Sequence, residues 1–185
     1  KGTIKRKAYY ILSRMEDVGG ELNAYTTKEE TCIHGTFFSQ YYGRALELIS
    51  DIAFNSSFPA NELKKEREII LDEINSYKDS PSELIFDEFE ELLFDGNPLG
   101  RNILGNEKSL KVFTPGSIKD FIRRNYSTDQ MVVTSVGDIQ FGKLVKLFET
   151  WFNGPVMKSS TGRTPVKYHY KPLQKQVSRN TFQAH

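Results

Sequence analysis

The spacing of apolar residues along this chain predicts a structure made mostly of helices. Apolar side chains recur every three or four positions in several stretches, which is the period of a helix with one buried face. Glycine pairs and prolines mark some of the ends, because Gly19-Gly20 suits a helix C-terminus and Pro59 and Pro81 suit a first turn. The predicted helices cover Lys5–Val18, Gln40–Asn55, Pro59–Asp79, Pro81–Phe94, Thr114–Tyr126 and Phe141–Phe152.

Three other stretches have the extended pattern of strands. Glu21–Thr26 and Thr31–Phe38 flank a short polar segment, which predicts a hairpin, and Met131–Val136 is the clearest strand in the chain. Helices outnumber strands, so the predicted fold class is α+β, with helices packed on one face of a mostly antiparallel or mixed sheet. Further strands of this sheet are expected to lie outside the sequence.

The domain organisation follows from where this pattern stops. Residues 1–152 form one predicted N-terminal domain, residues 153–176 have little periodicity and are predicted to be a linker, and residues 177–185 are predicted to begin a following strand or domain. The chain opens on Lys1 and ends at His185 within a partly alternating pattern. We therefore expect a segment of a longer protein, truncated at both ends.

Composition excludes several classes of function. Lys and Arg number 25 and Asp and Glu 24, and no basic cluster is interleaved with aromatic residues, so nucleic acid is not an expected partner. The apolar runs are too short to span a membrane. The single cysteine, Cys32, cannot form an internal disulfide, which permits a cytoplasmic location without establishing it.

Two glutamates, Glu66 and Glu73, are the most informative polar residues. Both lie beside the apolar arc of the predicted helix Pro59–Asp79, between the directions of Tyr77 and Ile69. A carboxylate directed toward the dry side of a helix needs a compensating cation, donor or metal. Two interpretations remain open, namely boundary residues whose charged ends reach water, and a metal or catalytic site.

Other catalytic arrangements have little support. Neither G-x-x-x-x-G-K-[ST] nor G-x-G-x-x-G occurs, so the sequence gives no evidence of a phosphate-binding loop. Cys32 and His34 share a strand face but have no further Cys or His nearby, which favours a small core thiol and an exposed imidazole over a metal site. A catalytic zinc takes three protein ligands, of which a helical glutamate can be one, and no histidine pair at helical spacing supplies the others. If Glu66 and Glu73 belong to a metal site, the residues of this sequence therefore supply only part of it.

Five sequence blocks, in order, carry a resemblance to a known family. They are GGELNAYTTKEET, RALELISD, KKEREIILDEI, NPLGRNILG and RRNYSTDQMVVTSVGDI. From Lys1 to about Phe152 the chain resembles the N-terminal domain of the pitrilysin, insulinase and mitochondrial processing peptidase family of zinc peptidases. Lys1-Gly2-Thr3 is similar to the segment that follows the inverted zinc motif H-x-x-E-H in that family.

The resemblance implies roles for individual residues. Glu73 matches the third zinc ligand and Glu66 the accessory glutamate of the same helix. Asn23 and Ala24 match the edge strand along which the family lays an extended peptide or protein substrate, and Arg101 matches a loop that shapes the cleft. Ordinary sheet structure and a structural ion pair are the alternatives for Asn23 and Arg101.

The implied function is that of a zinc metalloendopeptidase, which hydrolyses peptide bonds by a zinc-activated water. The sequence contains no H-x-x-E-H, so the chain as given is expected to be inactive and to bind no zinc. A second peptidase-like domain of the same parent chain is an expected partner, and exposed apolar surface is expected to favour a homodimer. The alternatives are a non-catalytic peptide-binding or scaffolding subunit of the same fold, and an unrelated α+β interaction domain.

Overall fold

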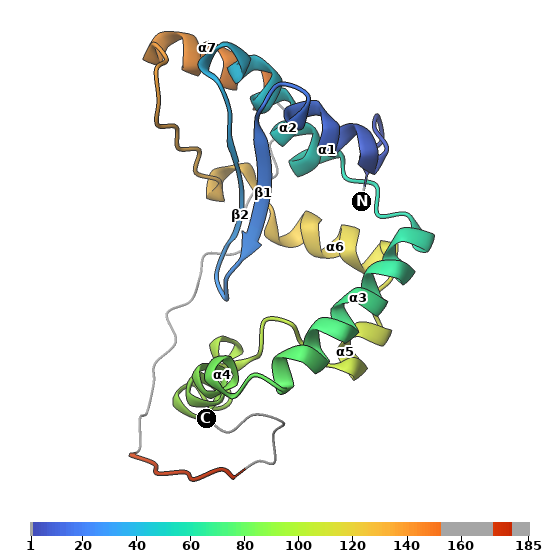
Figure 1. Cartoon of the computed structure of the whole chain (residues 1–185), viewed down its shortest axis with the longest axis vertical. Helices are drawn as coiled ribbons and strands as arrows, with labels where there is room; N and C mark the ends of the chain where they lie inside the picture. Colours follow the sequence, from blue (N-terminus) through green and yellow to red (C-terminus); the bar gives the residue numbers. More distant parts are fainter. Residues whose placement is uncertain (1, 153–171, 179–185) are drawn as a thin grey trace. The chain divides into compact units, whose positions relative to one another are not determined.

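The computed structural model describes residues 2–152 and 172–178 (Figure 1). In these ranges the longer elements are α1 (Ala8–Glu16), β1 (Glu21–Thr26), β2 (Thr31–Thr36), α2 (Tyr42–Asn55), α3 (Ala60–Lys78), α4 (Pro81–Leu93), α5 (Glu107–Lys111), α6 (Pro115–Asn125) and α7 (Phe141–Phe152). Single 3-10 turns, η1 (Ser39–Tyr41), η2 (Pro98–Gly100) and η3 (Thr128–Gln130), lie between them. The predicted α+β class and most predicted helices are confirmed.

The described residues divide into two units, each with its own contacts. The first contains residues 2–25, 31–63 and 114–152, and the second contains residues 26–30, 64–113 and 172–178. The helix α3 runs from the first unit into the second, and the turn between β1 and β2 belongs to the second. No helix in the described ranges is long and apolar enough to cross a membrane.

In the first unit, helices cover one face of the β1–β2 hairpin. Its most buried side chains come from α1 and α2, with Met15 and Ala45 each 1% exposed and Leu48 0% exposed. Ile11, Leu22, Phe37 and Ile52 pack around this cluster. Burying apolar area of this kind is the main stabilising term in folding. The hairpin and α1 are therefore held against α2.

The helix α7 packs on α2 through aromatic side chains. The rings of Phe148 and Phe152 stack with centroids 4.6 Å apart, and Phe152 meets the edge of Phe54 at 5.9 Å. Offset and edge-to-face ring pairs stabilise packing beyond the area that they bury. Ser50 adds a hydrogen bond of 2.5 Å to the carbonyl oxygen of Trp151. The predicted apolar face of this helix is thus used against α2.

The second unit is held by smaller groups of contacts. Among its described residues, Ile74 of α3 and Leu110 of α5 are buried apolar side chains, at 7% and 6% exposed. Arg67 donates a hydrogen bond of 3.0 Å to the carbonyl oxygen of Phe113. Gly100 is required by a close approach, because a Cβ there would lie 2.8 Å from the carbonyl oxygen of Phe94.

Three predicted elements differ from the structure. Met131–Val136 is not a strand in the described residues, where the sheet consists of β1 and β2. Valine favours strands, but no neighbouring strand pairs with the backbone of this segment in the described residues. Val136 is accordingly 100% exposed. The predicted first helix begins three residues late, because Gly2 and Lys7 form an antiparallel bridge before it.

The third difference is α5, which occupies residues 107–111, where the sequence pattern predicts no helix. Its start is fixed by a capping box, in which the side chain of Asn106 accepts from the Ser109 N–H and the Ser109 hydroxyl accepts from the Asn106 N–H. The predicted linker (153–176) and the predicted strand start (177–185) fall mostly outside the described residues. The part that is described, residues 172–178, is exposed and has neither helix nor strand.

Candidate functional site

The two predicted acidic residues lie on α3, one heptad apart. The predicted apolar arc of this helix is its better-buried face, because Ile74 is buried and Ile70 and Tyr77 are half-buried. Glu66 is half-buried, whereas Glu73 is exposed. Within residues 2–152 and 172–178, the side chain of Glu73 makes no hydrogen bond or ion pair, so its exposed carboxylate is accessible to an external group. Its role as a metal ligand stays a prediction.

The described residues do not by themselves fit a zinc ion. No group of three or more His, Cys, Asp or Glu side chains that could hold a metal occurs among residues 2–152 and 172–178. Zinc sites need three or four such ligands, and Glu73 offers a single carboxylate. Cys32 is half-buried and His34 is exposed, with the His34 ring 5.8 Å from that of Tyr25. A zinc site that includes Glu73 would therefore need ligands from other residues.

The predicted substrate-binding residues of β1 are both exposed. Asn23 and Ala24 lie in the middle of this strand, which pairs with β2 within the described part of the sheet. The side-chain oxygen of Asn23 accepts a hydrogen bond of 2.8 Å from the N–H of Ala24. A peptide that used this N–H would first have to displace the Asn23 side chain. Substrate binding at this strand stays a prediction.

The predicted cleft residue Arg101 is exposed and directly follows η2. Its loop is fixed on both sides, by Asn97, which accepts from the Leu99 N–H at 2.9 Å, and by Asn102, which donates to Asp87 of α4 at 2.6 Å. The backbone N–H of Arg101 donates to the carbonyl oxygen of Pro98 at 3.1 Å, whereas its side chain forms no hydrogen bond or ion pair in the described ranges. The structural ion pair that sequence analysis gives as an alternative is thus absent there.

Asp87 belongs to a polar group that sequence analysis did not identify. Lys28, in the turn between the strands, places its Nζ 2.5 Å from Glu90 Oε2 and 3.9 Å from Asp87 Oδ1, and its side chain is 15% exposed. Burial and the neighbouring Asp87 carboxylate raise the pKa of Tyr77, whose hydroxyl also donates to the carbonyl oxygen of Glu83 at 3.1 Å. These contacts position the turn at 26–30 and the Asn102 loop against α4.

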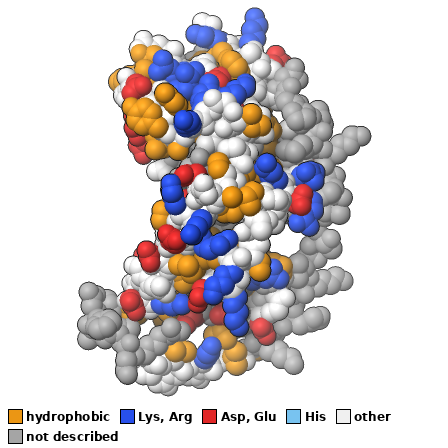
Figure 2. All heavy atoms as spheres, turned by 90° about the vertical axis from the view of Figure 1, so that its right-hand side faces the viewer, with side chains coloured by type: hydrophobic (Ala, Val, Ile, Leu, Met, Phe, Trp, Pro, Cys, Tyr) orange, Lys and Arg blue, Asp and Glu red, His pale blue; other side chains and the backbone are white. Residues whose placement is uncertain are grey.

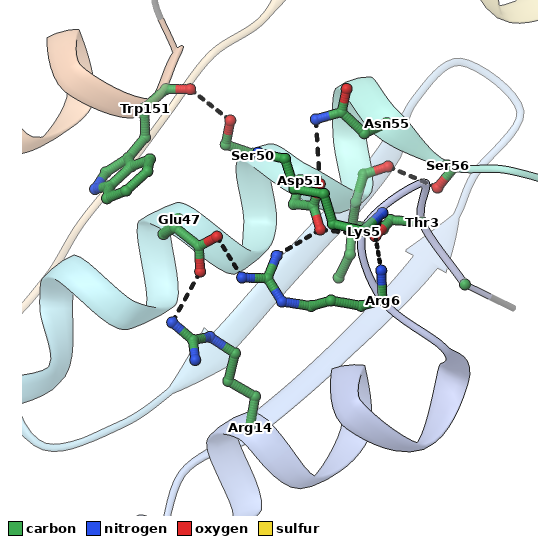
Figure 3. A network of polar contacts seen from close by, with 12 residues as sticks. Thr3, Lys5, Arg6, Arg14, Glu47, Ser50, Asp51, Asn55, Ser56 and Trp151 are labelled. Atoms are coloured by element: carbon green, nitrogen blue, oxygen red, sulfur yellow. Dashed lines mark hydrogen bonds and ion pairs between the residues drawn. The ribbon is translucent and has the colours of Figure 1, made fainter.

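A second polar network anchors the N-terminal segment to α2 (Figure 3). Arg6 donates to Asp51 at 2.5 Å and to Glu47 at 2.6 Å, and Arg14 of α1 contacts the other oxygen of Glu47 at 2.9 Å. The Thr3 hydroxyl also donates to Asp51, at 2.8 Å. Charge-assisted hydrogen bonds of this kind are stronger than neutral ones. Residues 3–6 are therefore held against the second half of α2.

Asp51 is the centre of this network, with 3% exposure. Burial would raise the pKa of its carboxyl, but hydrogen bonds from Thr3, Arg6 and Asn55 outweigh that effect and lower it. The sequence itself indicates that Asp51 lies near the buried face of its helix, because it is three positions after Leu48. It also places Asn55 one turn later on the same side of the helix. A charged residue on the buried face of a helix needs partners, and these came from the N-terminal segment.

Backbone contacts complete the anchoring. Thr3 and Ser56 form an antiparallel bridge, and the Ile4 N–H donates to the carbonyl oxygen of Asn55 at 2.9 Å. The Gly2 carbonyl oxygen accepts from both the backbone N–H and the hydroxyl of Ser57, at 3.1 and 3.2 Å. The segment is thus fixed by main-chain as well as side-chain contacts.

Known proteins match the chain in sequence and in fold. The relative named "Uncharacterized zinc protease YmxG", from Bacillus subtilis, is 32% identical over 186 residues, which cover 100% of this chain and 45% of the relative. A protease from Helicobacter pylori superposes with a TM-score of 0.79 at 22% identity, over 91% of this chain and 40% of that chain. The inactive domain of a peptidase M16 from Pseudomonas fluorescens superposes with a TM-score of 0.78 at 17% identity, over 89% and 40% of the two chains.

These matches confirm the resemblance inferred from the five sequence blocks. This chain spans less than half the length of each of these three proteins. Residues 1–107 match the family described as Insulinase (Peptidase family M16). The match covers more than half of the sequence, and the chain belongs to the insulinase family of peptidases, family M16.

Proposed function

We propose that this chain is part of a zinc metalloendopeptidase, to which it contributes a carboxylate ligand from α3. The observation that carries the proposal is the exposed carboxylate of Glu73, one heptad from the half-buried Glu66, beside the helix face that contains the buried Ile74. Its relative of 32% identity is named a zinc protease. Glu73 would be the third zinc ligand and Glu66 would support it from the same helix.

The remaining ligands and the general base would come from outside these 185 residues. The sequence contains no H-x-x-E-H, and no metal-binding group forms in the ranges that the structure describes. The chain by itself is therefore proposed to be inactive toward peptides. In the whole protein, a second peptidase-like domain would close the site, and a bound zinc would activate the attacking water.

An extended peptide is the proposed substrate. The strand β1 exposes Asn23 and Ala24, and an extended chain can pair with such a strand through main-chain hydrogen bonds while its side chains occupy adjacent pockets. Arg101, exposed on a loop that Asp87 and Asn102 hold in place, is proposed to shape the cleft for that peptide.

The experiment is a pair of matched substitutions in the whole protein. Glu73→Gln removes the charge of the proposed ligand, and Glu68→Gln removes an equivalent charge from an exposed residue of the same helix. Zinc content after dialysis and peptide hydrolysis are measured for both. We expect both to be lost in Glu73→Gln and retained in Glu68→Gln, and unchanged zinc and activity in Glu73→Gln would refute the assignment.

A non-catalytic role in the same fold is the second candidate. It is favoured by the large apolar side chains that α4 leaves exposed, since Phe86 is 70% and Phe89 61% exposed, as expected for a surface that binds a peptide or a partner subunit. The full gene distinguishes the two candidates. An H-x-x-E-H preceding Lys1 supports the enzyme, and a different pentapeptide at that position supports the binding role.

A further inference from the structure

A basic pocket in the first unit is not used by the proposed peptidase function. It lies between the N-terminal segment, α1 and α2, and it has a volume of about 330 Å³. The α1 residues that line it form one stripe of the helix, at spacings of three and four. The lining residues are Lys5, Arg6, Tyr10, Ser13, Arg14, Asp17 and Arg44.

Two of the lining cations are already paired with carboxylates. Arg6 and Arg14 direct their guanidinium groups at Glu47 and Asp51, at distances of 2.5 to 2.9 Å. The Nε of Arg14 is buried and has no hydrogen-bond partner in the described residues. A buried donor without an acceptor costs free energy, which an acceptor brought by a ligand would recover after a small movement of the side chain.

The remaining cations have no carboxylate partner. Neither Lys5 nor Arg44 forms an ion pair within residues 2–152 and 172–178, and Asp17 is the one acidic residue that lines the pocket. Counting Glu47 and Asp51 with Asp17, four cations face three carboxylates, which leaves one positive charge in excess. Such an excess, concentrated at a concave surface, attracts anions.

The guanidinium group of Arg44 is held in place for binding an anion. Its Nη1 donates to the carbonyl oxygen of Arg14 at 3.1 Å, and its guanidinium carbon lies 5.5 Å from the ring centre of Tyr41. These contacts hold the planar group in one orientation and leave other N–H groups for a ligand. A guanidinium fork matches the oxygen spacing of phosphate.

We propose that this basic pocket binds a small diphosphate-bearing molecule. Ser13 and Tyr10 also line the pocket, and their hydroxyl groups would supply neutral donors in addition to Lys5 and Arg44. The pocket volume of about 330 Å³ is larger than one phosphate group needs. A linked pair of phosphates uses this space better than a single phosphate does.

Binding of pyrophosphate to the whole protein tests the proposal, by isothermal titration calorimetry at low ionic strength. Single exposed charges contribute up to about 1 kcal/mol, so we expect Lys5→Gln to weaken binding about two- to fivefold. We expect Asp17→Asn to strengthen binding by a similar factor, because it removes the one repelling carboxylate of the lining. The control Lys143→Gln, an exposed lysine of α7 outside the pocket, should leave the affinity unchanged.

Arg44 is tested by two variants, since its side chain also contacts Arg14 and Tyr41. Arg44→Lys retains the charge and should bind more tightly than Arg44→Gln if the charge matters. ADP and inorganic phosphate serve as further ligands, and the proposal requires that ADP bind about as well as pyrophosphate and phosphate more weakly. No binding of pyrophosphate at millimolar concentration, an unchanged affinity in Asp17→Asn, or equal losses in Lys5→Gln and Lys143→Gln would each overturn the proposal.

Discussion

The guanidinium group of Arg6 lies 2.5 Å from the carboxylate of Asp51, although the two residues are 45 positions apart in sequence. Asp51 is almost fully buried, and three side chains donate hydrogen bonds to it. A buried carboxylate is tolerated when its charge is paired and its oxygens are satisfied. The pair fixes the N-terminal segment on α2, and several of its consequences can be measured.

Replacing Asp51 with Asn should destabilise the protein by about 3 kcal/mol. The substitution leaves the guanidinium of Arg6 with Glu47 alone, and breaking a buried ion pair from one side usually costs several kcal/mol. Urea denaturation followed by circular dichroism measures the change in the free energy of unfolding. Asp138→Asn is the control, because Asp138 is exposed, and equal stabilities of the two variants would contradict the prediction.

Stability should fall in acid because of the same carboxyl group. Burial raises the pKa of Asp51, but its hydrogen bonds outweigh this and place the pKa below the usual 3.8. A lowered pKa in the folded state means that the stabilisation is present at neutral pH and is lost as the pH falls from about 4 through the folded-state value. Urea titrations between neutral pH and pH 3 should show a steeper loss for the wild type than for Asp51→Asn, and parallel curves would contradict this.

Two isoleucines of α3 should differ strongly in their contribution to stability. Ile74 is 7% exposed and Ile69 is 51% exposed. Ile74→Ala removes buried methyl groups and leaves a cavity, which should cost about 2–4 kcal/mol, whereas Ile69→Ala should cost less than about 1 kcal/mol. Thermal and urea unfolding of both variants measure the difference. Similar costs would show that Ile74 is not a core residue of the second unit.

The exposed apolar face of α4 should promote self-association of this chain. Ile85 and Phe89 are both 61% exposed, one turn apart, and Phe86 beside them is 70% exposed. More generally, Figure 2 shows hydrophobic side chains reaching the surface in several places on one face of the molecule, among charged side chains of both signs. Apolar side chains gathered on one helix favour contact with a second copy.

Light scattering at high protein concentration tests this expectation. We expect a mass above that of the monomer for the unmodified chain, and a lower mass for Phe86→Ser. Glu91→Ser, at an exposed polar position of the same helix, should leave the mass unchanged. A monomeric mass of the unmodified chain would show that this face does not bring copies together.

The helices could be predicted from sequence because their signals are local. The apolar period and the residues that start a helix each act within a few positions. Pro81 occupies the first turn of α4, and Thr114 caps α6. The segment Met131–Val136 was assigned wrongly because a strand depends on a neighbour, which its own residues cannot reveal. The α5 helix was missed because its capping box, Asn106 to Ser109, uses asparagine and serine in place of the expected serine and glutamate.

The candidate site was predicted only as far as single elements allow. The positions of Glu66 and Glu73 on one helix follow from periodicity, and the structure confirms that helix. The contacts of Lys28 with α4, and of Arg6 with α2, join segments that are far apart in sequence. Pairing of charges over such separations has no periodic signal, so a single sequence could not indicate it.

The bridge between Thr3 and Ser56 has a consequence for the order of folding. The two residues are separated by α1, the hairpin and α2, so the chain must close a loop of about fifty residues before they meet. Local elements form much faster than contacts of that separation. We therefore expect the N-terminal segment to be among the last parts to lock into place and the first to detach, so that a protease added under mildly denaturing conditions would cut there before it reached α2.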